Sequence, residues 1–408
     1  MKTPNPMKEK KILFITHLYY PALGGAERVF RQLAEGLVAK GWQVTVLTSD
    51  ALSTEHYFTT IQNNLASKEI INGVEVIRES IQAPVYKAFK VFDRLARRAG
   101  RMGVFFRPLV FGPHFSGFRR KIGKFFFPFV IAGPVPTTAP FYGLLYKFFH
   151  PSSRLIILSH MHIKDRLHKT QLNLMAIRRA DFVLTTTPSE RKFLLAHKVN
   201  EKKVGLFFNA VDNFLLKSPS PLNPPSKKSV LYLGQEGEHK RIPLLLNAML
   251  NLWEEGMELE LWIAGARTQY SWTIDRLIEK LPAKYRHLVS RFNNISEEEK
   301  VSLIDRCFVL VNPSSYESFG LVFLEAWARR KPVIGARIPA VRDIIQDGVD
   351  GLLFEDKNEA DLKNKIKLLL QNEELALRMG EKGQEKVLSC FTQEKVIATL
   401  ENYLLNLP

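Results

Sequence analysis

The sequence predicts an α/β fold of two facing, doubly wound parallel-sheet domains of the Rossmann-like kind. Short apolar stretches alternate with amphipathic helical patterns along nearly the whole chain, which is typical of parallel sheets wrapped by helices. Four prolines within residues 218–229 interrupt this alternation near the middle and indicate a linker. A chain of 408 residues is long enough for two such domains, each with its own hydrophobic core.

The first half, which we assign to a domain over residues 1–212, begins with a buried strand at 12–16. This apolar run is broken by His17 and Pro21, which favours a strand over the core of a signal peptide. Residues 125–146 carry no charge, but the four prolines among them exclude an ordinary membrane-spanning helix. The other expected elements of this half are helices at 26–40 and from Thr138, and strands at 43–48, 129–132, 155–158, 181–185 and 203–208.

The second half repeats the alternation after the linker, which we place at residues 213–228. A second domain is expected over residues 229–390. Its expected strands are 230–233, 259–263, 288–292, 308–311 and 332–334, and its expected helices begin near Pro243 and cover 274–281, 297–306 and 321–329. Residues 358–405 have a mostly helical pattern, with acid–base pairs on one face.

The net charge of +17 belongs entirely to the first half. Residues 1–200 carry 30 basic and 12 acidic residues, whereas residues 201–408 carry 28 and 29. Residues 81–150 alone hold 12 basic residues, a single acid and many phenylalanines, including the run Phe125–Phe127. Such a segment favours an anionic membrane surface as partner. Single-stranded nucleic acid, and rings that simply fill a core, are the alternatives.

Ligands of doubly wound folds bind beside the carboxyl ends of the strands, and the first motif directly follows the first strand. Gly24 and Gly25 open a helix there, ahead of Ala26 and Glu27. Two glycines let the backbone curl tightly and point N–H groups at an anion, which the helix dipole also favours. A purely structural turn with Glu27 as its capping acid is the alternative.

The second motif, residues 233–241, follows the first strand of the second half. Gly234 suits the close approach of a ligand to a strand end. Lys240 lies near the start of the next helix, where an ammonium group can meet a phosphate. An exposed, charged loop is the alternative.

The third motif, residues 311–325, places Glu317 in a loop and Glu325 eight residues later in a helix. The N-terminus of that helix offers free N–H groups to an anion; they belong to Phe319, Gly320, Leu321 and Val322. Glu325, one turn further on, is placed to accept both hydroxyls of a ribose, and Glu317 would reach a sugar beyond the phosphates. Carboxylates that flank a phosphate site therefore indicate a nucleotide-sugar, although Glu317 would also serve as a helix-capping acid.

These motifs resemble the family-four glycosyltransferases with the GT-B fold. The resemblance covers roughly residues 11–390. It rests on Glu317 with Glu325, the strand 331–334, the turn 347–354, the loop 24–27 and the segment 209–212. It implies retaining transfer of a sugar from a nucleoside diphosphate, with no metal or other cofactor, and the sequence holds no Asp-x-Asp pair. It also implies that the last helix, within residues 391–408, crosses back to pack on the first domain.

On this basis we assign roles to the candidate residues. The expected catalytic residues are Glu317, His162 and Lys240, and Glu27 and His160 are expected on the acceptor side. The expected donor-binding residues are Gly24, Gly25, Gly234, Gln235, Lys240, Ile295, Phe319, Gly320, Leu321, Val322 and Glu325. His160, His162 and His168 with Asp165 do not have the spacing of a metal site, and no metal is expected.

The sequence departs from the family pattern at three places. Gln235 stands where family members usually have Arg, and Arg241 stands where they have Gly. This leaves Lys240 as the main cation for the diphosphate, assisted by Arg241. The family's first-domain histidine has no counterpart at residues 130–134, so His160 and His162 are the expected substitutes.

We therefore expect a glycosyltransferase that acts as a peripheral protein at the inner face of the cell membrane, on a lipid-linked or polysaccharide acceptor of the cell envelope. No nucleic-acid partner is expected. Two cysteines, Cys307 and Cys390, are too few for a disulfide framework and indicate a reducing, cytoplasmic compartment; both are expected in the core. A nucleotide-sugar epimerase or hydrolase of the same fold, and a degenerate sugar-nucleotide-binding protein, are the alternatives.

Overall fold

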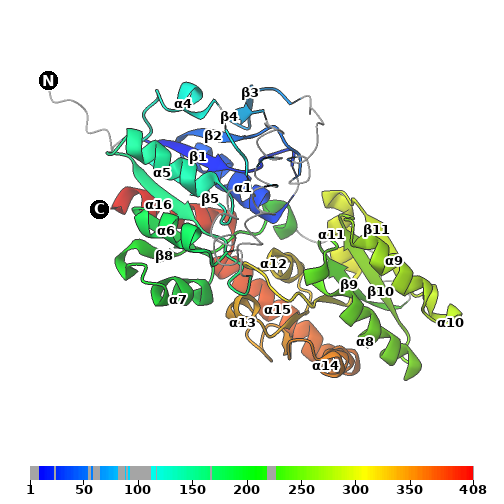
Figure 1. Cartoon of the computed structure of the whole chain (residues 1–408). Helices are drawn as coiled ribbons and strands as arrows, with labels where there is room; N and C mark the ends of the chain where they lie inside the picture. The colour runs from blue at the N-terminus through cyan, green and yellow to red at the C-terminus, as the bar shows by residue number, and fades with distance from the viewer. Residues whose placement is uncertain are drawn as a thin grey trace. The chain divides into compact units, whose positions relative to one another are not determined.

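The computed structural model describes residues 9–22, 24–53, 57, 65–80, 88, 91, 112–115, 117–165, 168–217 and 227–407. The chain divides into two compact units, one of residues 1–209 with 393–408 and one of residues 210–392. Each unit is a mainly parallel sheet covered by helices, so the predicted class of two parallel-sheet α/β domains is confirmed (Figure 1). No helix in the described ranges is both long and apolar enough to cross a bilayer.

The described residues of the first unit form an eight-stranded sheet in the order β3-β4-β2-β1-β5-β6-β7-β8. Its strands are β1 (Lys11–Thr16), β2 (Gln43–Ser49), β3 (Lys68–Ile71), β4 (Val74–Glu79), β5 (Phe129–Gly133), β6 (Arg154–Leu158), β7 (Phe182–Thr185) and β8 (Val204–Leu206). Its helices are α1 (Gly25–Ala39), α4 (Phe118–Lys121), α5 (Ala139–Phe149), α6 (Gln171–Arg179), α7 (Pro188–Ala196), the 3₁₀ turn η4 (Glu201–Lys203) and α16 (Gln393–Asn406).

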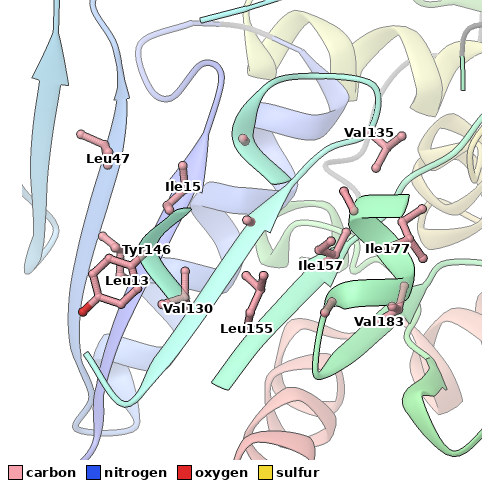
Figure 2. Packing of buried hydrophobic residues seen from close by; sticks show 14 of the residues in the cluster. Leu13, Ile15, Leu47, Val130, Val135, Tyr146, Leu155, Ile157, Ile177 and Val183 are labelled. Atoms are coloured by element: carbon pink, nitrogen blue, oxygen red, sulfur yellow. The ribbon is translucent and has the colours of Figure 1, made fainter. Parts of the chain in front are cut away.

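The core of the first unit lies between the central strands and the helices α5 and α6. Alternate residues of neighbouring strands point to the same face of a sheet, so the apolar residues of β1, β5, β6 and β7 form one layer. Figure 2 shows this layer, with Leu13, Ile15, Val130, Leu155, Ile157 and Val183 packed with Tyr146 and Ile177. Three rings of the phenylalanine-rich segment, Phe115, Phe118 and Phe127, belong to the same core. For these three rings the alternative of core filling is confirmed.

The hairpin of β3 and β4 is an element that our sequence analysis missed. The two strands pair antiparallel across the turn Asn72–Gly73, whose φ angles are 49° and 81°. An Asn-Gly pair at positive φ is the preferred two-residue hairpin turn, so the signal was present in the sequence. The rest of the sheet is parallel, as the alternation with helices predicts.

The C-terminal helix α16 packs on the first unit. Ile397 lies so close to Gly36 of α1 that a Cβ there would come within 2.5 Å of it. Glu401 accepts hydrogen bonds from Lys10 Nζ (3.0 Å) and Trp42 Nε1 (2.9 Å). These contacts join α16 to α1 and to the residues that directly precede β1 and β2 of the same unit.

The described residues of the second unit form a six-stranded parallel sheet in the order β11-β10-β9-β12-β13-β14. Its strands are β9 (Lys228–Leu233), β10 (Leu259–Gly265), β11 (Val289–Asn293), β12 (Val309–Asn312), β13 (Val333–Ala336) and β14 (Leu352–Phe354). Its helices are α8 (Ile242–Glu254), α9 (Ser271–Glu279), α10 (Ala283–Arg286), α11 (Glu297–Arg306), α12 (Leu321–Ala328), α13 (Pro339–Ile344), α14 (Glu359–Gln371) and α15 (Glu373–Cys390). Two 3₁₀ turns, η5 (Asn213–Leu216) and η6 (Glu238–Lys240), complete the unit.

Two details differ from the expectations. Residues 213–217, which the sequence assigned to the linker, belong to the second unit, where Asn213–Leu216 form η5 and Arg329 Nη1 donates a hydrogen bond to Leu215 O (3.0 Å). Residues 218–226 lie outside the described residues. Cys307 is buried as expected, but Cys390 is exposed at the end of α15, so its expected burial is wrong.

Each sheet has one switch point, where the strand order reverses direction. It lies between β1 and β5 in the first unit and between β9 and β12 in the second. A crevice forms outside the carboxyl ends of the strands at such a point, which is where doubly wound folds bind their ligands. The first motif follows β1, the second follows β9 and the third follows β12, so all three lie at switch points.

Candidate functional site

The second unit brings the loops after β9 and β12 together. The backbone N–H and the hydroxyl of Ser315 both donate to His239 O, at 2.8 and 3.0 Å. The rings of His239 and Tyr316 stack at 4.8 Å with 8° between their planes. The second and third sequence motifs therefore form one site at the switch point.

Lys240 and Glu317 meet at the centre of this site. The 3₁₀ turn η6 presents Lys240, whose Nζ lies 2.5 Å from Glu317 Oε1. Asn312, the last residue of β12, donates to the same oxygen from its Nδ2 at 3.2 Å. Both charged side chains are largely buried, so an ammonium group and a carboxylate lie side by side and are partly shielded from water.

Glu325 lies one turn inside α12 and is 3% exposed. The helix begins after Gly320, whose φ of 98° is a left-handed conformation, and a Cβ there would come 2.7 Å from the Phe323 ring. Only glycine is therefore unstrained at this helix start. Phe319 is buried, whereas Leu321 and Val322 are half-buried in the first turn.

Lys300 is a site residue that sequence reasoning missed. Its Nζ lies 3.2 Å from Glu325 Oε1, and it also pairs with Glu297. In the sequence Lys300 follows three acidic residues on a polar helix, a pattern that predicts a solvent-exposed helix face. Only the packing of α11 beside α12 buries it to 8% exposure and gives the Glu325 carboxylate a cation.

Three further expectations concern this unit. Gln235 is exposed in the loop after β9, and Gly234 has a φ of 144° that only glycine adopts readily. Arg241, whose φ of 51° is a left-handed conformation, pairs with Asp356. Ile295 is half-buried between the end of β11 and Ser296, the N-cap of α11.

In the first unit, Glu27 folds back over the glycine turn. A Cβ on Gly24 would lie 2.1 Å from Glu27 Oε2, so a larger residue there would displace the end of this side chain. Glu27 Oε1 lies 3.1 Å from His17 Nε2, and both side chains are buried. Burial raises the pKa of Glu27, but the hydrogen bond and charge of His17 outweigh it, and the net pKa lies below its ordinary value.

His17 is a second residue that sequence reasoning missed as a site residue. It directly follows β1, and that position at the carboxyl end of a central strand was the available signal. The turn of Gly24 and Gly25 thus has a buried histidine–carboxylate pair beside it.

The two candidate histidines after β6 lie in different environments. His160 is 5% exposed at a φ of 46°, and its Nε2 lies 3.1 Å from Asn209 Oδ1. Burial lowers the pKa of His160 to about 4. His160 and Glu27 also shift each other's pKa electrostatically, so the two side chains lie near each other. His162 is half-buried; its backbone N–H donates to His168 Nδ1 at 3.2 Å. The described residues contain no cluster of three metal-ligating side chains.

The buried, neutral His160 predicts a pH dependence of stability. The unfolded chain binds this proton near pH 6.5 and the folded chain only near pH 4, so the free energy of unfolding falls as the pH drops through that window. The loss between pH 7.5 and pH 4.5 is about 2–3 kcal/mol. We expect His160→Asn to remove this part of the difference in urea unfolding between the two pH values. The exposed His287 is the control: His287→Asn should leave the difference unchanged, and an unchanged difference in His160→Asn would disprove the assignment.

Comparison with known proteins identifies the family. The model described as Glycosyltransferase Family 4 matches residues 23–213, and the model described as Glycosyl transferases group 1 matches residues 215–386. The chain belongs to the family-four glycosyltransferases. The resemblance seen in the sequence is thereby confirmed.

Relatives and solved structures agree with this membership. An uncharacterised glycosyltransferase of Methanocaldococcus jannaschii is 34% identical over 155 residues, which are 38% of this family-four chain and 42% of that relative. The chain therefore matches less than half the length of this curated relative. Sucrose-phosphate synthase from Thermosynechococcus elongatus has a TM-score of 0.74 at 21% identity, covering 96% of this chain and 97% of that one. Anabaena HepE in complex with UDP-glucose has a TM-score of 0.72 at 17% identity, covering 97% and 99%. Both structures share the fold.

Proposed function

We propose that this family-four protein transfers a sugar, with retention of configuration, from a nucleoside-diphosphate sugar to a lipid-linked or polysaccharide acceptor. The observation that carries the proposal is the pair of carboxylates at one switch point, each held by its own lysine: Glu325 by Lys300 and Glu317 by Lys240. Carboxylates beside a helix N-terminus suit hydroxyl groups on either side of a phosphate. The complex of HepE with UDP-glucose, which shares the fold, is consistent with such a donor.

In this proposal each residue of the second unit has a distinct task. Glu325 accepts hydrogen bonds from the ribose hydroxyls, and the N-terminus of α12 receives the diphosphate. Lys240 leaves Glu317 and binds the diphosphate instead. Its ammonium group then stabilises the negative charge that grows on the diphosphate as the bond to the sugar breaks. Glu317, released from the lysine, faces the reacting sugar. Its carboxylate then favours the positive charge that develops on the sugar ring.

The first unit supplies the proposed acceptor side. Glu27 and His17 lie on this side, beside Gly24 and Gly25, which we propose as donor-binding residues that offer the N-terminus of α1 to an anion. His160 is held neutral near the same carboxylate, and His162 is the proposed catalytic histidine. Because His160 is almost fully buried, its proposed role is to orient the wall of this site through Asn209.

Sugar-nucleotide turnover with and without a membrane extract tests the proposal. A transferase releases nucleoside diphosphate only when the extract supplies an acceptor. Release without the extract would instead indicate a hydrolase, and conversion of the sugar without release would indicate an epimerase. Binding without either would indicate a degenerate sugar-nucleotide-binding protein.

We also propose that the first unit docks on an anionic membrane at the cytoplasmic face. Residues 81–111 of the basic segment lie outside the described residues, apart from positions 88 and 91. In the described part, Leu145, Phe148 and Phe149 share one face of α5 by their spacing, and Phe148 is 76% exposed. Tyr146 Oη donates to the backbone oxygen of Phe125, which is itself 56% exposed in the adjoining loop beside the exposed Lys124. Exposed rings beside basic groups favour the interface of an anionic bilayer.

We expect the protein to sediment with anionic vesicles and not with neutral ones, and salt to weaken this binding without abolishing it. Each basic residue near the surface contributes about 1 kcal/mol that salt screens, whereas buried rings contribute a part that it does not. Phe148→Ser should weaken binding about fivefold, because a large exposed ring is lost. Leu377→Ser is the matched control, since Leu377 is 58% exposed on the second unit. Equal recovery on neutral vesicles, or tighter binding to single-stranded nucleic acid, would refute the proposal.

A further inference from the structure

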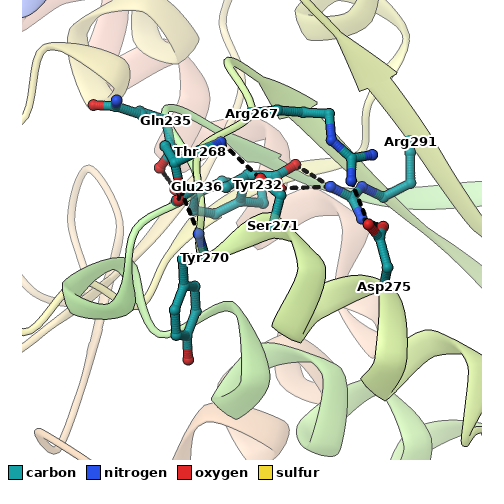
Figure 3. Close-up of polar contacts among 9 residues, drawn as sticks. All are labelled: Tyr232, Gln235, Glu236, Arg267, Thr268, Tyr270, Ser271, Asp275 and Arg291. Atoms are coloured by element: carbon teal, nitrogen blue, oxygen red, sulfur yellow. Dashed lines mark hydrogen bonds and ion pairs between the residues drawn. The ribbon is translucent and has the colours of Figure 1, made fainter. Parts of the chain in front are cut away.

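The loop after β9 is anchored by an ion pair between Glu236 and Arg291. Glu236 is fully buried, and both of its carboxylate oxygens contact Arg291 Nη2 of β11, the longer contact at 2.5 Å. Arg291 also forms an ion pair with Asp275 of α9, and Asp275 forms a second ion pair with Arg267 in the loop after β10 (Figure 3). The alternative of an exposed, charged loop is therefore wrong at Glu236.

The backbone around Glu236 is also fixed. Gly234 N–H donates to Ala264 O at 2.9 Å and Glu236 N–H donates to Ala266 O at 3.0 Å, so the pairing of β9 with β10 continues beyond both strands. Thr268 Oγ1 donates to Glu236 O, which adds a side-chain bond on the same side. Gly265 permits this close approach: a Cβ there would lie 2.1 Å from Gly234 O.

This pairing has a consequence for the residues between. Successive residues of an extended strand direct their N–H groups to opposite sides within the sheet. The N–H groups of Gly234 and Glu236 face β10, so those of Gln235 and Gly237 face the other neighbour of β9, which is β12. Within the described part of the chain these two N–H groups have no hydrogen-bond partner. Glu317 follows β12 and therefore lies on that side, together with its partner Lys240.

We propose that Glu236 and Arg291 are positioning residues for the donor diphosphate, an inference that rests on the proposed function. Their ion pair holds the loop against β10 and β11, so that two backbone N–H groups stand ready for phosphate oxygens beside Lys240. The loop thereby binds the diphosphate although Gln235 brings no positive charge. A prepositioned N–H group loses little freedom on binding, whereas a loop released from its anchor must be ordered first.

Affinities for uridine, adenosine and guanosine diphosphates and for the matching nucleosides test this inference. Calorimetry measures these affinities directly, and competition experiments measure those of nucleosides that bind too weakly for direct titration. With the diphosphate that binds best, Glu236→Gln and Arg291→Met should each lower affinity about tenfold and leave that of the nucleoside within about twofold, because only the phosphate contacts depend on the loop. The double variant should bind no more weakly than the weaker single variant, since the two side chains act as one anchor. Arg291→Lys keeps the charge and should restore part of the affinity.

A second buried ion pair of the same unit provides the control. Arg329 binds Asp305 with its Nε and Nη2, each at 2.6 Å, at the C-terminal ends of α12 and α11 and therefore away from the carboxyl edge of the sheet. Asp305→Asn should lower stability to urea but keep the ratio of diphosphate to nucleoside affinity. Additive losses of affinity in the double variant, or equal losses of affinity for nucleoside and diphosphate, would overturn this inference and leave the proposed function standing. A wild-type protein that binds none of the three diphosphates would overturn the proposed function first.

Discussion

Glu325→Ala is expected to lower the affinity for the nucleoside diphosphate by at least about 100-fold. Hydrogen bonds to a charged group contribute about 1.5–3 kcal/mol each, and the proposal gives this carboxylate two ribose hydroxyls. The carboxylate is shielded from water, because Glu325 is 3% exposed and Lys300 Nζ lies 3.2 Å from one of its oxygens. Calorimetric titration measures the loss directly. The 2′,3′-dideoxy analogue, which lacks both hydroxyls, should bind wild type and variant equally weakly.

Glu297→Gln is the matched control for Glu325. It removes the other ion pair of Lys300, but Glu297 is more than half exposed, so it leaves no buried charge without a partner. We expect its affinity for the nucleoside diphosphate to stay within about threefold of wild type. If Glu325→Ala bound the diphosphate as tightly as wild type, the ribose assignment would be wrong.

Glu317→Gln is expected to reduce turnover by at least about 100-fold while the affinity for the nucleoside diphosphate stays the same or rises. The carboxylate acts on the sugar in the transition state, so its loss appears in kcat. At the same time Lys240, which lies 2.5 Å from Glu317, is freed for the diphosphate. Release of nucleoside diphosphate at saturating donor, with membrane extract as acceptor source, gives the turnover, and calorimetry gives the affinity.

Glu238 offers the control for this variant. It is exposed on η6, two residues before Lys240, and Glu238→Gln removes a charge from the same loop. We expect both its turnover and its affinity to stay within about twofold of wild type, because an exposed charge is well screened. A Glu317→Gln variant that keeps wild-type turnover would show that the residue only caps or orients the loop.

Much of the second unit could be predicted because its signals are local. The helix expected at residues 297–306 coincides with α11, which Ser296 and Glu299 begin with a capping box. Lys240 and Glu317 meet because the loops that carry them follow neighbouring strands, β9 and β12. Position after a strand is readable in a sequence once the fold class is known.

The residues that were missed act through partners distant in the chain. The packing of helices and strands forms three pairs of this kind. They are Lys300 with Glu325, Glu236 with Arg291, and His17 with Glu27. A charged residue beside other charges predicts a solvated face, and no local pattern reveals that tertiary packing will bury it. For the same reason the phenylalanine-rich segment divides into buried rings such as Phe115 and exposed ones such as Phe148.

A crystal structure with the nucleoside diphosphate that binds most tightly tests the donor site most directly. We expect the ribose hydroxyls within hydrogen-bond distance of the Glu325 carboxylate. The diphosphate should lie between the N-terminus of α12 and the loop of Gln235 and Gly237, with Lys240 turned from Glu317 to a phosphate oxygen. A ligand bound away from the switch point of β9 and β12, or a ribose that leaves Glu325 without contact, would show that the donor site is assigned to the wrong residues.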